Sequence, residues 1–254
     1  MRSGFLELPT PHAFAHRGGA GHFPENTWRA FEHAVALGYP YLETDAHATS
    51  DGVLVAFHDK TLDRATDRTG AIASLTAAEV AAARVGGTDQ IPLLADLLGA
   101  WPRLRFNIDV KDAPAARPLA ELISRTAAWD RVCITSFSGA RLRATRRLLD
   151  RPVCMAASPA GAAALRSPVP ATALAPRFAA RWVRCAQLPA RMATAPVIAR
   201  AHAAGLQVHV WTVNDRRQME SLLDLGVDGL MTDQTELLRD VLVGRGEWHP
   251  AAGG

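Results

Sequence analysis

Seven side chains with acid, base or cationic chemistry follow short apolar runs at four points of the chain. They are His16, Arg17, Glu43, Asp45, His58, Asp109 and Lys111. Residues two apart on a β-strand point to the same side, so Glu43 and Asp45 share one side, as do Asp109 and Lys111. Buried carboxylates are costly unless they are paired or bound to a cation. Glu43 and Asp45 therefore predict either salt bridges, with an arginine as partner, or a cation site.

The composition of this set favours chemistry on a phosphoester. Three carboxylates can hold a hard cation through oxygen, which favours Ca²⁺ or Mg²⁺ over zinc. Arg17 can bind a phosphate through two hydrogen bonds, and Lys111 can supply a point charge. His16 and His58 can share general acid and general base roles because imidazole titrates near neutral pH. A cation, two cationic side chains and an acid/base pair together predict phosphoester cleavage.

The scaffold that must position these side chains alternates short β-type runs with longer helical patterns. We predict strands at Phe14–His16, Tyr41–Asp45, Leu54–His58, Arg105–Val110, Val132–Phe137, Val153–Ala157, Val183–Leu188, Gln207–Val213 and Gly229–Thr232. Helical patterns lie between them at Thr27–Leu37, Pro114–Ala128, Ser138–Leu149, Pro196–Ala204 and Asp215–Leu225, with Asn26 as a candidate N-cap of the first. The strand assignment within 159–189 is left open.

This alternation predicts an α/β protein with a parallel sheet and helices outside it. About eight such units in 254 residues fit a (β/α)8 TIM barrel, and no GxGxxG motif favours an open dinucleotide-binding sheet. We expect one barrel domain over residues 1–254. The run Leu54–His58 follows the second strand too closely for a helix to intervene, so we expect residues 58–98 to form a small insertion on the active face. Barrel enzymes place their sites at the carboxyl ends of strands, where the charged residues fall.

Composition and charge exclude several other classes of protein. The chain is 48% hydrophobic and 21% charged, with a mean hydropathy of zero, which is typical of a soluble globular protein. It has no 18-residue apolar stretch, which argues against a membrane span, and Met1–His12 lacks the apolar region of a secretory signal. The net charge of +3 is spread along the chain, so no nucleic-acid partner is expected.

We assign no chemistry to the cysteines or to the remaining histidines. Cys133, Cys154 and Cys185 are odd in number and lack CxxC spacing, so we interpret them as core residues of a reduced compartment without a metal or redox role. This favours a cytoplasmic protein. We expect His12 to face solvent. His22 and His47 lie near the motifs and could support the site residues, but a surface position is the favoured interpretation.

The order and spelling of the motifs resemble the glycerophosphodiester phosphodiesterase family, a branch of the phosphatidylinositol-phospholipase-C-like phosphodiesterase barrels. The matching strings are His16-Arg-Gly-Gly, Pro24-Glu-Asn-Thr, Glu43-Thr-Asp, Thr49-Ser-Asp-Gly, Phe57-His-Asp, Asn107-Ile-Asp-Val-Lys, Val210-Trp-Thr-Val-Asn and Gly226-Val-Asp-Gly-Leu-Met-Thr-Asp. They run from residue 16 to residue 233, nearly the whole chain.

The resemblance implies a role for each matching position. His16 and His58 match the family's acid/base pair, while Arg17 and Lys111 match positions that hold the phosphate. Trp211 matches an aromatic residue that contacts the glycerol end, although a core tryptophan on a buried strand is an equal alternative. The metal ligands of the family match Glu43, Asp45 and Asp109.

The chain also departs from the family at the third ligand and at the end of the last motif. Many members carry glutamate where Asp109 stands, so the shorter aspartate predicts looser or water-mediated ligation. A proline often follows the final Thr-Asp, where this chain has Gln234. Glu25 in the Pro-Glu-Asn-Thr motif is a candidate to brace the site.

The resulting hypothesis is metal-dependent hydrolysis of a small glycerophosphodiester to sn-glycerol 3-phosphate and an alcohol, with Ca²⁺ or Mg²⁺ as cofactor. One alternative is a phosphodiesterase that acts on lysophospholipids or another bulky diester in the same fold. A more distant alternative is a non-catalytic barrel that binds phosphodiesters or a partner protein. The sequence leaves open which histidine is the acid, whether water or the glycerol hydroxyl attacks first, and the oligomeric state.

Overall fold

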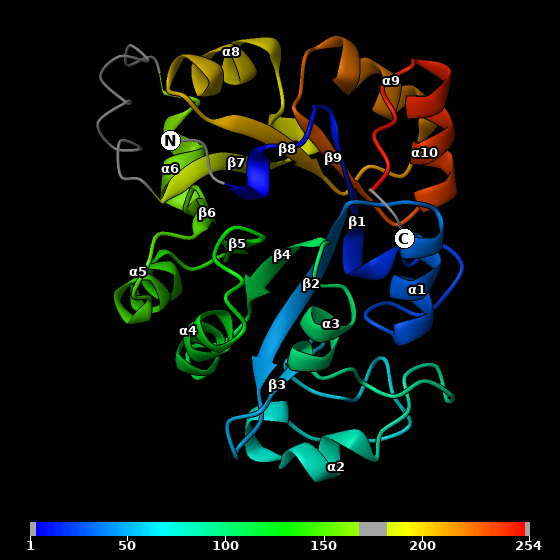
Figure 1. The fold of residues 1–254 in the computed structure, drawn as a ribbon, viewed down its shortest axis with the longest axis vertical. Coiled ribbons are helices and arrows are strands. Elements are labelled where there is room, and N and C mark those ends of the chain that lie inside the picture. The colour runs from blue at the N-terminus through cyan, green and yellow to red at the C-terminus, as the bar shows by residue number, and fades with distance from the viewer. Residues whose placement is uncertain (1–3, 168–181, 252–254) are drawn as a thin grey trace.

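Eight parallel strands form a closed barrel in the computed structural model, which describes residues 4–167 and 182–251 (Figure 1). The strands are β1 (His12–Ala15), β2 (Tyr41–Ala48), β4 (Arg105–Val110), β5 (Val132–Thr135), β6 (Cys154–Ala156), β7 (Val183–Pro189), β8 (Gln207–Trp211) and β9 (Gly229–Thr232). β1 pairs in parallel with both β2 and β9, and these two pairings close the barrel. The predicted (β/α)8 TIM barrel is therefore confirmed.

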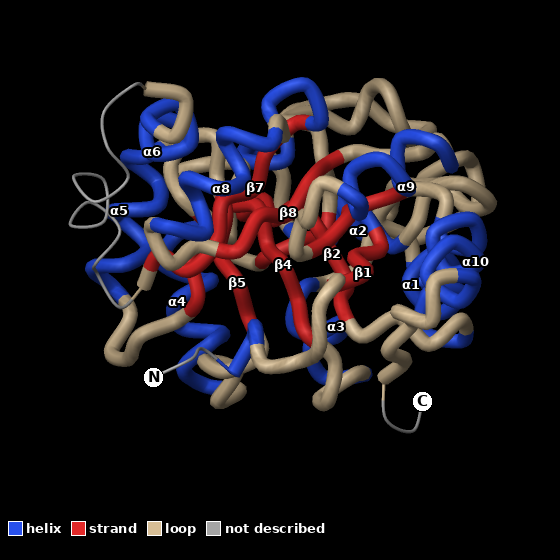
Figure 2. Tube along the Cα trace, turned by 90° about the horizontal axis from the view of Figure 1, so that it is seen from above, coloured by secondary structure: helices blue, strands red, loops and turns tan. Residues whose placement is uncertain are grey.

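Helices surround the strands on the outside (Figure 2). They are α1 (Trp28–Ala36), α3 (Leu94–Ala100), α4 (Ala116–Arg125), α5 (Gly139–Leu148), α6 (Pro159–Ala164), α8 (Ala195–Ala203), α9 (Arg216–Asp224) and α10 (Thr235–Gly244). Side-chain oxygens begin several of them. Ser138 caps α5 and Asp215 caps α9, each by accepting a backbone N–H three residues later. In the part of the chain that is described, no helix is long and apolar enough to cross a membrane.

The predicted elements agree with the structure in most places and differ from it at the start of the first helix. Thr27, and not Asn26, is the N-cap of α1, because its side chain accepts the N–H of Ala30 at 3.3 Å. Asn26 adopts a left-handed conformation with φ of 55° and turns its amide into the barrel instead. The helices α2 (Ala77–Ala81), α3, α6 and α10 were not predicted, and α6 and β7 fill part of the stretch left open. Residues 168–181 of that stretch lie outside the described residues.

A short antiparallel strand and a small helix follow β2 and stand apart from the barrel (Figure 1). The strand β3 (Leu54–Ala56) pairs with the end of β2, and α2 (Ala77–Ala81) lies further along. The region has an apolar cluster of its own, formed by Val55, Phe57, Leu62, Ile72, Val80, Ala83, Val85 and Ile91. The barrel helix α3 already begins at Leu94, inside the stretch predicted as an insertion. Arg29 of α1 pairs with Asp89 and so links this region to the barrel.

Two separate apolar layers stabilise the barrel. The larger layer lies between the strands and the helices, and the smaller one lies inside the barrel around Phe5, Phe14 and Tyr41. A single turn at Gly4–Leu6 brings Phe5 to the inner layer, where the Tyr41 hydroxyl donates a hydrogen bond to its carbonyl at 2.8 Å. The expectation that His12 faces solvent is wrong. Its side chain lies in β1, 2% exposed, because β1 points it into the barrel interior against Tyr41.

Candidate active site

A cavity of about 450 Å³ opens at the carboxyl ends of the strands. All eight residues that the sequence singled out line it: His16, Arg17, Glu43, Asp45, His58, Asp109, Lys111 and Trp211. They come from β2, β4 and β8 and from the loops that follow β1, β3 and β4. This position agrees with the general location of active sites in (β/α)8 barrels.

His16 begins the turn that follows β1 and is held by two acidic groups. Its Nδ1 lies 2.7 Å from Oδ1 of Asp233, at the end of β9, and its Nε2 lies 3.9 Å from Oε2 of Glu43. Burial opposes protonation of the ring, but attraction to Glu43 and the hydrogen bond to Asp233 outweigh it, so the pKa of His16 is raised. A neutral ring that donates Nδ1–H to Asp233 keeps Nε2 available for a proton.

His58 is held in the same way by a different carboxylate. Its Nδ1 lies 2.6 Å from Oδ1 of Asp59, and Arg64 pairs with the other oxygen of Asp59. The backbone beneath is fixed by His47, which is hydrogen-bonded to Asp112 at 2.7 Å and through Nε2 to the carbonyl of His58 at 3.2 Å. His47 is 2% exposed, so the expected surface position is wrong for this residue. It supports the loop that carries a candidate catalytic histidine.

Arg17 occupies a backbone conformation that directs it into the cavity. The turn His16–Gly18 gives Arg17 a φ of 51°, and Gly18 and Gly19 continue with φ of 83° and 91°. A Cβ on Gly18 would lie 2.9 Å from the backbone nitrogen of Phe31, so only glycine fits against α1. The Arg17 guanidinium pairs with Glu25 at 2.8 Å, which confirms a contact between Glu25 and the site.

Glu43 and Asp45 point to the same side of β2 and are both nearly fully buried. Burial, followed by repulsion from Asp45, raises the pKa of Glu43 above its usual value. Asp45 behaves in the opposite way. Burial opposes its ionisation, but Lys111 and Arg17 outweigh it and lower its pKa. The Asn26 amide also donates to Oδ2 of Asp45 at 2.9 Å, so Asp45 is surrounded by donors.

Asp109 lies beside Asp45 because the two are direct partners in the β2–β4 register. Lys111 is hydrogen-bonded to both, with Nζ 2.9 Å from Oδ1 of Asp45 and 2.9 Å from Oδ2 of Asp109. The other oxygen of Asp109 is buried without a hydrogen-bond partner. Burial raises the pKa of Asp109 despite the attraction of Lys111. Asp45 and Asp109 thus form salt bridges, as one of the two interpretations predicted. Oδ1 of Asp109 is still available for a ligand.

The opposite wall of the cavity is mostly apolar, and Arg166 and Arg191 are its charged members. Phe137, in the loop after β5, is 63% exposed, and its ring and that of Trp211 meet edge to face at a centroid distance of 5.4 Å. Trp211 is half-buried and lines the cavity, so it is not a fully buried core residue. Other residues of this wall come from the loop after β6, from α6, from the end of β7 and from the turn after it: Ala157, Pro159, Ala162, Ala163, Pro189 and Met192.

Sequence reasoning missed the partners that orient the histidines. Asp59 and Asp233 stand in motifs that were noted, yet only the fold reveals that each binds an imidazole. Asn107 and Gln187 were also missed. Their amides are hydrogen-bonded across the barrel, with Nε2 of Gln187 2.7 Å from Oδ1 of Asn107, and both line the cavity. Asn107 lies two residues before Asp109 in the same motif, so the two side chains point to the same side of the strand. This spacing was a signal that the sequence offered.

Comparisons with known proteins agree with this geometry. The model of the glycerophosphoryl diester phosphodiesterase family matches residues 16–237. "Probable glycerophosphodiester phosphodiesterase 2" of Mycobacterium tuberculosis is 45% identical over 249 residues, which cover 94% of this chain and 93% of that protein.

Solved structures share the fold over nearly the whole chain. A crystal structure from Silicibacter pomeroyi DSS-3, named for the same family, superposes with a TM-score of 0.81 at 25% identity and covers 97% of this chain and 98% of that chain. An Oleispira antarctica phosphodiesterase, in complex with the product sn-glycerol-3-phosphate, has a TM-score of 0.78 at 22% identity, with 92% and 97% covered.

The family match spans most of the chain, and the relative from M. tuberculosis is well above 30% identical. The motifs that suggested the resemblance converge on one cavity at the expected end of the barrel. The chain belongs to the glycerophosphoryl diester phosphodiesterase family and is an enzyme, a phosphoric diester hydrolase.

Proposed function

We propose that this enzyme hydrolyses a small glycerophosphodiester to sn-glycerol 3-phosphate and an alcohol, with His16 and His58 as the acid/base pair. The observation that carries the proposal is the matched environment of the two rings. Each lines the same cavity, and each has Nδ1 within 2.7 Å of a carboxylate, Asp233 for His16 and Asp59 for His58. This arrangement leaves Nε2 of both rings to exchange protons. One ring removes a proton from the nucleophile, and the other donates a proton to the departing alkoxide.

Arg17 and Lys111 are proposed to bind the phosphate. Both side chains line the cavity, and both have a cationic group next to Asp45. The guanidinium can donate two hydrogen bonds to phosphate oxygens, and the ammonium adds a point charge. Because neighbouring carboxylates balance these cations, the phosphodiester monoanion must compete with them or enter together with a further cation.

A divalent cation, Ca²⁺ or Mg²⁺, fits this requirement. Glu43, Asp45 and Asp109 would hold it, since all three offer the oxygen donors that hard cations take. The buried Oδ1 of Asp109 without a partner supports the same assignment. When bound, the cation supplies Lewis acidity that neutralises charge on the phosphate as the bond breaks. Asp109 is two residues from Lys111 and bonded to it, so Lys111 is placed to bind phosphate beside the cation.

Trp211 is proposed to pack against the glycerol end of the substrate. Its ring lines the cavity on the side opposite the carboxylates, where it can cover the carbon backbone of glycerol. The complex of the Oleispira antarctica phosphodiesterase with sn-glycerol-3-phosphate supports a small product of this size in the same fold.

A bulky diester such as a lysophospholipid is a second candidate substrate. The observation that favours it is the apolar wall around Phe137, Pro159 and Met192, which can accept an alcohol with a hydrocarbon part. The residue 58–93 region does not supply this wall. A non-catalytic binding barrel is disfavoured because a binder needs no pair of carboxylate-held histidines.

The test is release of sn-glycerol 3-phosphate from glycerophosphocholine, with Ca²⁺, Mg²⁺ or EDTA in parallel and a lysophospholipid as the second substrate. We expect turnover that EDTA removes and that one cation restores. Equal turnover with EDTA would overturn the cation assignment and leave the histidines as the proposed catalysts. Release from the lysophospholipid alone would select the second candidate. If folded protein released no sn-glycerol 3-phosphate from either substrate, the proposed reaction would be overturned.

A further inference from the structure

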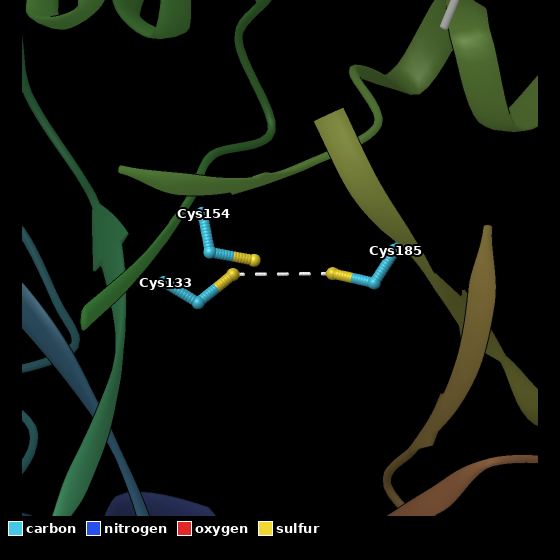
Figure 3. A group of neighbouring side chains, drawn as sticks. All are labelled: Cys133, Cys154 and Cys185. Carbon is cyan, nitrogen blue, oxygen red and sulfur yellow. Dashed lines mark hydrogen bonds between the residues drawn. The ribbon is translucent and has the colours of Figure 1, made fainter. Parts of the chain in front are cut away.

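Three cysteines from neighbouring strands converge inside the barrel (Figure 3). Cys133 lies in β5, Cys154 in β6 and Cys185 in β7. Their sulfur atoms all lie within 4.8 Å of one another, and Sγ of Cys133 is 3.9 Å from Sγ of Cys185. Each residue is at most 1% exposed, and all three carry reduced thiols. Core burial was expected for these residues, but their spacing in the sequence gave no sign that the thiols meet.

The register of the strands explains the convergence. Cys133 and Cys154 are direct partners in the β5–β6 register, and Cys185 of β7 pairs with Ala156 of β6. All three belong to the inner apolar layer, so their side chains point to the barrel interior (Figure 3). Strands β5 and β7 are separated by β6, which places the backbones of Cys133 and Cys185 about 9 Å apart, beyond the reach of a disulfide. Any disulfide here would also leave the third thiol unused.

A single thiophilic atom can use all three sulfurs. Three metal–thiolate bonds of about 2.3 Å require sulfur atoms about 4.0 Å apart in a planar arrangement and somewhat less in a pyramid. The 3.9 Å between Cys133 and Cys185 already meets this requirement. Since no pair exceeds 4.8 Å, the third sulfur needs to move by less than about 1 Å.

The buried surroundings of the three thiols favour a bound atom that leaves the site without a net charge. Phe14, Tyr41, Ala156 and Met231 belong to the same buried cluster, and the Tyr41 hydroxyl is already bonded to Phe5. Three thiolates on a monovalent or divalent metal leave a net negative charge, which is costly in an apolar interior. Zinc also prefers a fourth ligand. A trivalent atom that replaces three thiol protons leaves no charge at all.

We propose that Cys133, Cys154 and Cys185 form a binding site for trivalent arsenic, taken up as arsenous acid. Arsenous acid, As(OH)₃, is uncharged and small, and the cluster adjoins the cavity at Met231, which lines the cavity and also belongs to the cluster. Three As–O bonds break and three As–S bonds form. Each thiol proton leaves with a hydroxide as water, and arsenic stays trivalent, so no oxidant or reductant is needed.

The test uses the reduced full-length protein and sodium arsenite alone. Native mass spectrometry should show one adduct, with the mass of one arsenic atom less three hydrogen atoms, and excess of a small dithiol should remove it. Absence of this adduct from folded wild-type protein, or an adduct that retains oxygen, would overturn a three-thiol site. No substrate enters the measurement, so its outcome is independent of the proposed hydrolysis.

Variants identify the ligands. Cys133→Ala, Cys154→Ala and Cys185→Ala should each abolish the oxygen-free adduct and weaken arsenite binding at least ~10-fold, because only two As–S bonds remain. Cys154→Ser serves if the alanine variant fails to fold, since it keeps the side-chain volume. The matched control is Ile134→Val, a buried neighbour of Cys133 in the outer apolar layer, which removes one methyl group and leaves the sulfurs in place. Unchanged binding in any of the cysteine variants would contradict the proposal.

Discussion

The two halves of the cavity wall are built from different residue types. The half that β1, β2 and β4 supply is charged, and its members are bonded to one another: Lys111 bridges Asp45 and Asp109, and Arg17 pairs with Glu25. The half that β5 to β8 supply is mostly apolar, and Phe137 and Trp211 contact each other there by their rings alone.

This difference indicates that the two halves of the cavity wall have different roles in the proposed reaction. Groups that transfer protons or bind phosphate need fixed positions, and the charged half supplies them through hydrogen bonds to neighbouring carboxylates. An alcohol of variable size needs a surface that tolerates different shapes, and exposed rings provide it. Changes in the charged half should therefore lower turnover of every substrate, whereas changes in the apolar half should alter the preference between substrates.

The largest expected effect is the loss of either histidine. His16→Ala and His58→Ala should each lower kcat by about 10²–10⁴-fold on glycerophosphocholine, because the proton transfer loses its acid or its base. Steady-state kinetics with circular dichroism as a folding check measures this. The matched control is His22→Ala, since His22 is exposed and lies outside the cavity lining. More than a tenth of wild-type activity in either variant would remove that histidine from the pair.

Removal of a proposed cation ligand comes next. Glu43→Gln keeps the size of the side chain but removes its charge, so the response of the rate to added Ca²⁺ or Mg²⁺ should disappear and kcat should fall by at least ~10²-fold. Isothermal titration calorimetry of the free enzyme gives a second measurement, in which heat of cation binding should be lost. Glu32→Gln, on the exposed side of α1, is the control. An unchanged titration would show that Glu43 is not a ligand.

A smaller effect is expected from the groups that orient the histidines. Asp233→Asn should lower kcat by about 10–10²-fold with little change in KM, because His16 loses the partner of its Nδ1. Asp233 also helps to raise the pKa of His16, so the limb of the pH–rate profile that belongs to this ring should move to lower pH. The exposed Asp240→Asn is the control. A loss of activity without any change in the pH profile would point to a purely structural role.

Local patterns in the sequence were sufficient to predict the barrel and the residues of the charged half. Arg105–Val110 and Gly229–Thr232 were predicted with the observed bounds because the first alternates polar and apolar residues and the second is a short, mostly apolar run. Glu43, Asp45 and Asp109 were found because a carboxylate on an apolar strand is unusual wherever it occurs. These signals depend only on neighbours along the chain.

Features that depend on distant contacts were not predictable in this way. His47 is buried because Asp112, 65 residues away, accepts its Nδ1–H, and Asp233 meets His16 across 217 residues. Asn26 was assigned to a helix cap on its residue type, but its amide binds Asp45 on the neighbouring strand. The meeting of three cysteines likewise depends on strand register, which the spacing of the cysteines does not encode.

The smallest effect is expected in the apolar half, where Phe137 is 63% exposed at the cavity rim. Phe137→Ala should raise KM for a lysophospholipid about 5-fold, since roughly 1 kcal/mol of apolar contact with the hydrocarbon part is lost. Turnover of glycerophosphocholine should stay within about 2-fold, because the charged half is untouched. Val243→Ala removes an exposed apolar side chain from α10, far from the cavity lining, and should change neither substrate. An equal loss on both substrates would mean that Phe137 supports Lys111, whose Nζ lies 5.7 Å from its ring centroid, and the division between the two halves would then fail at this residue.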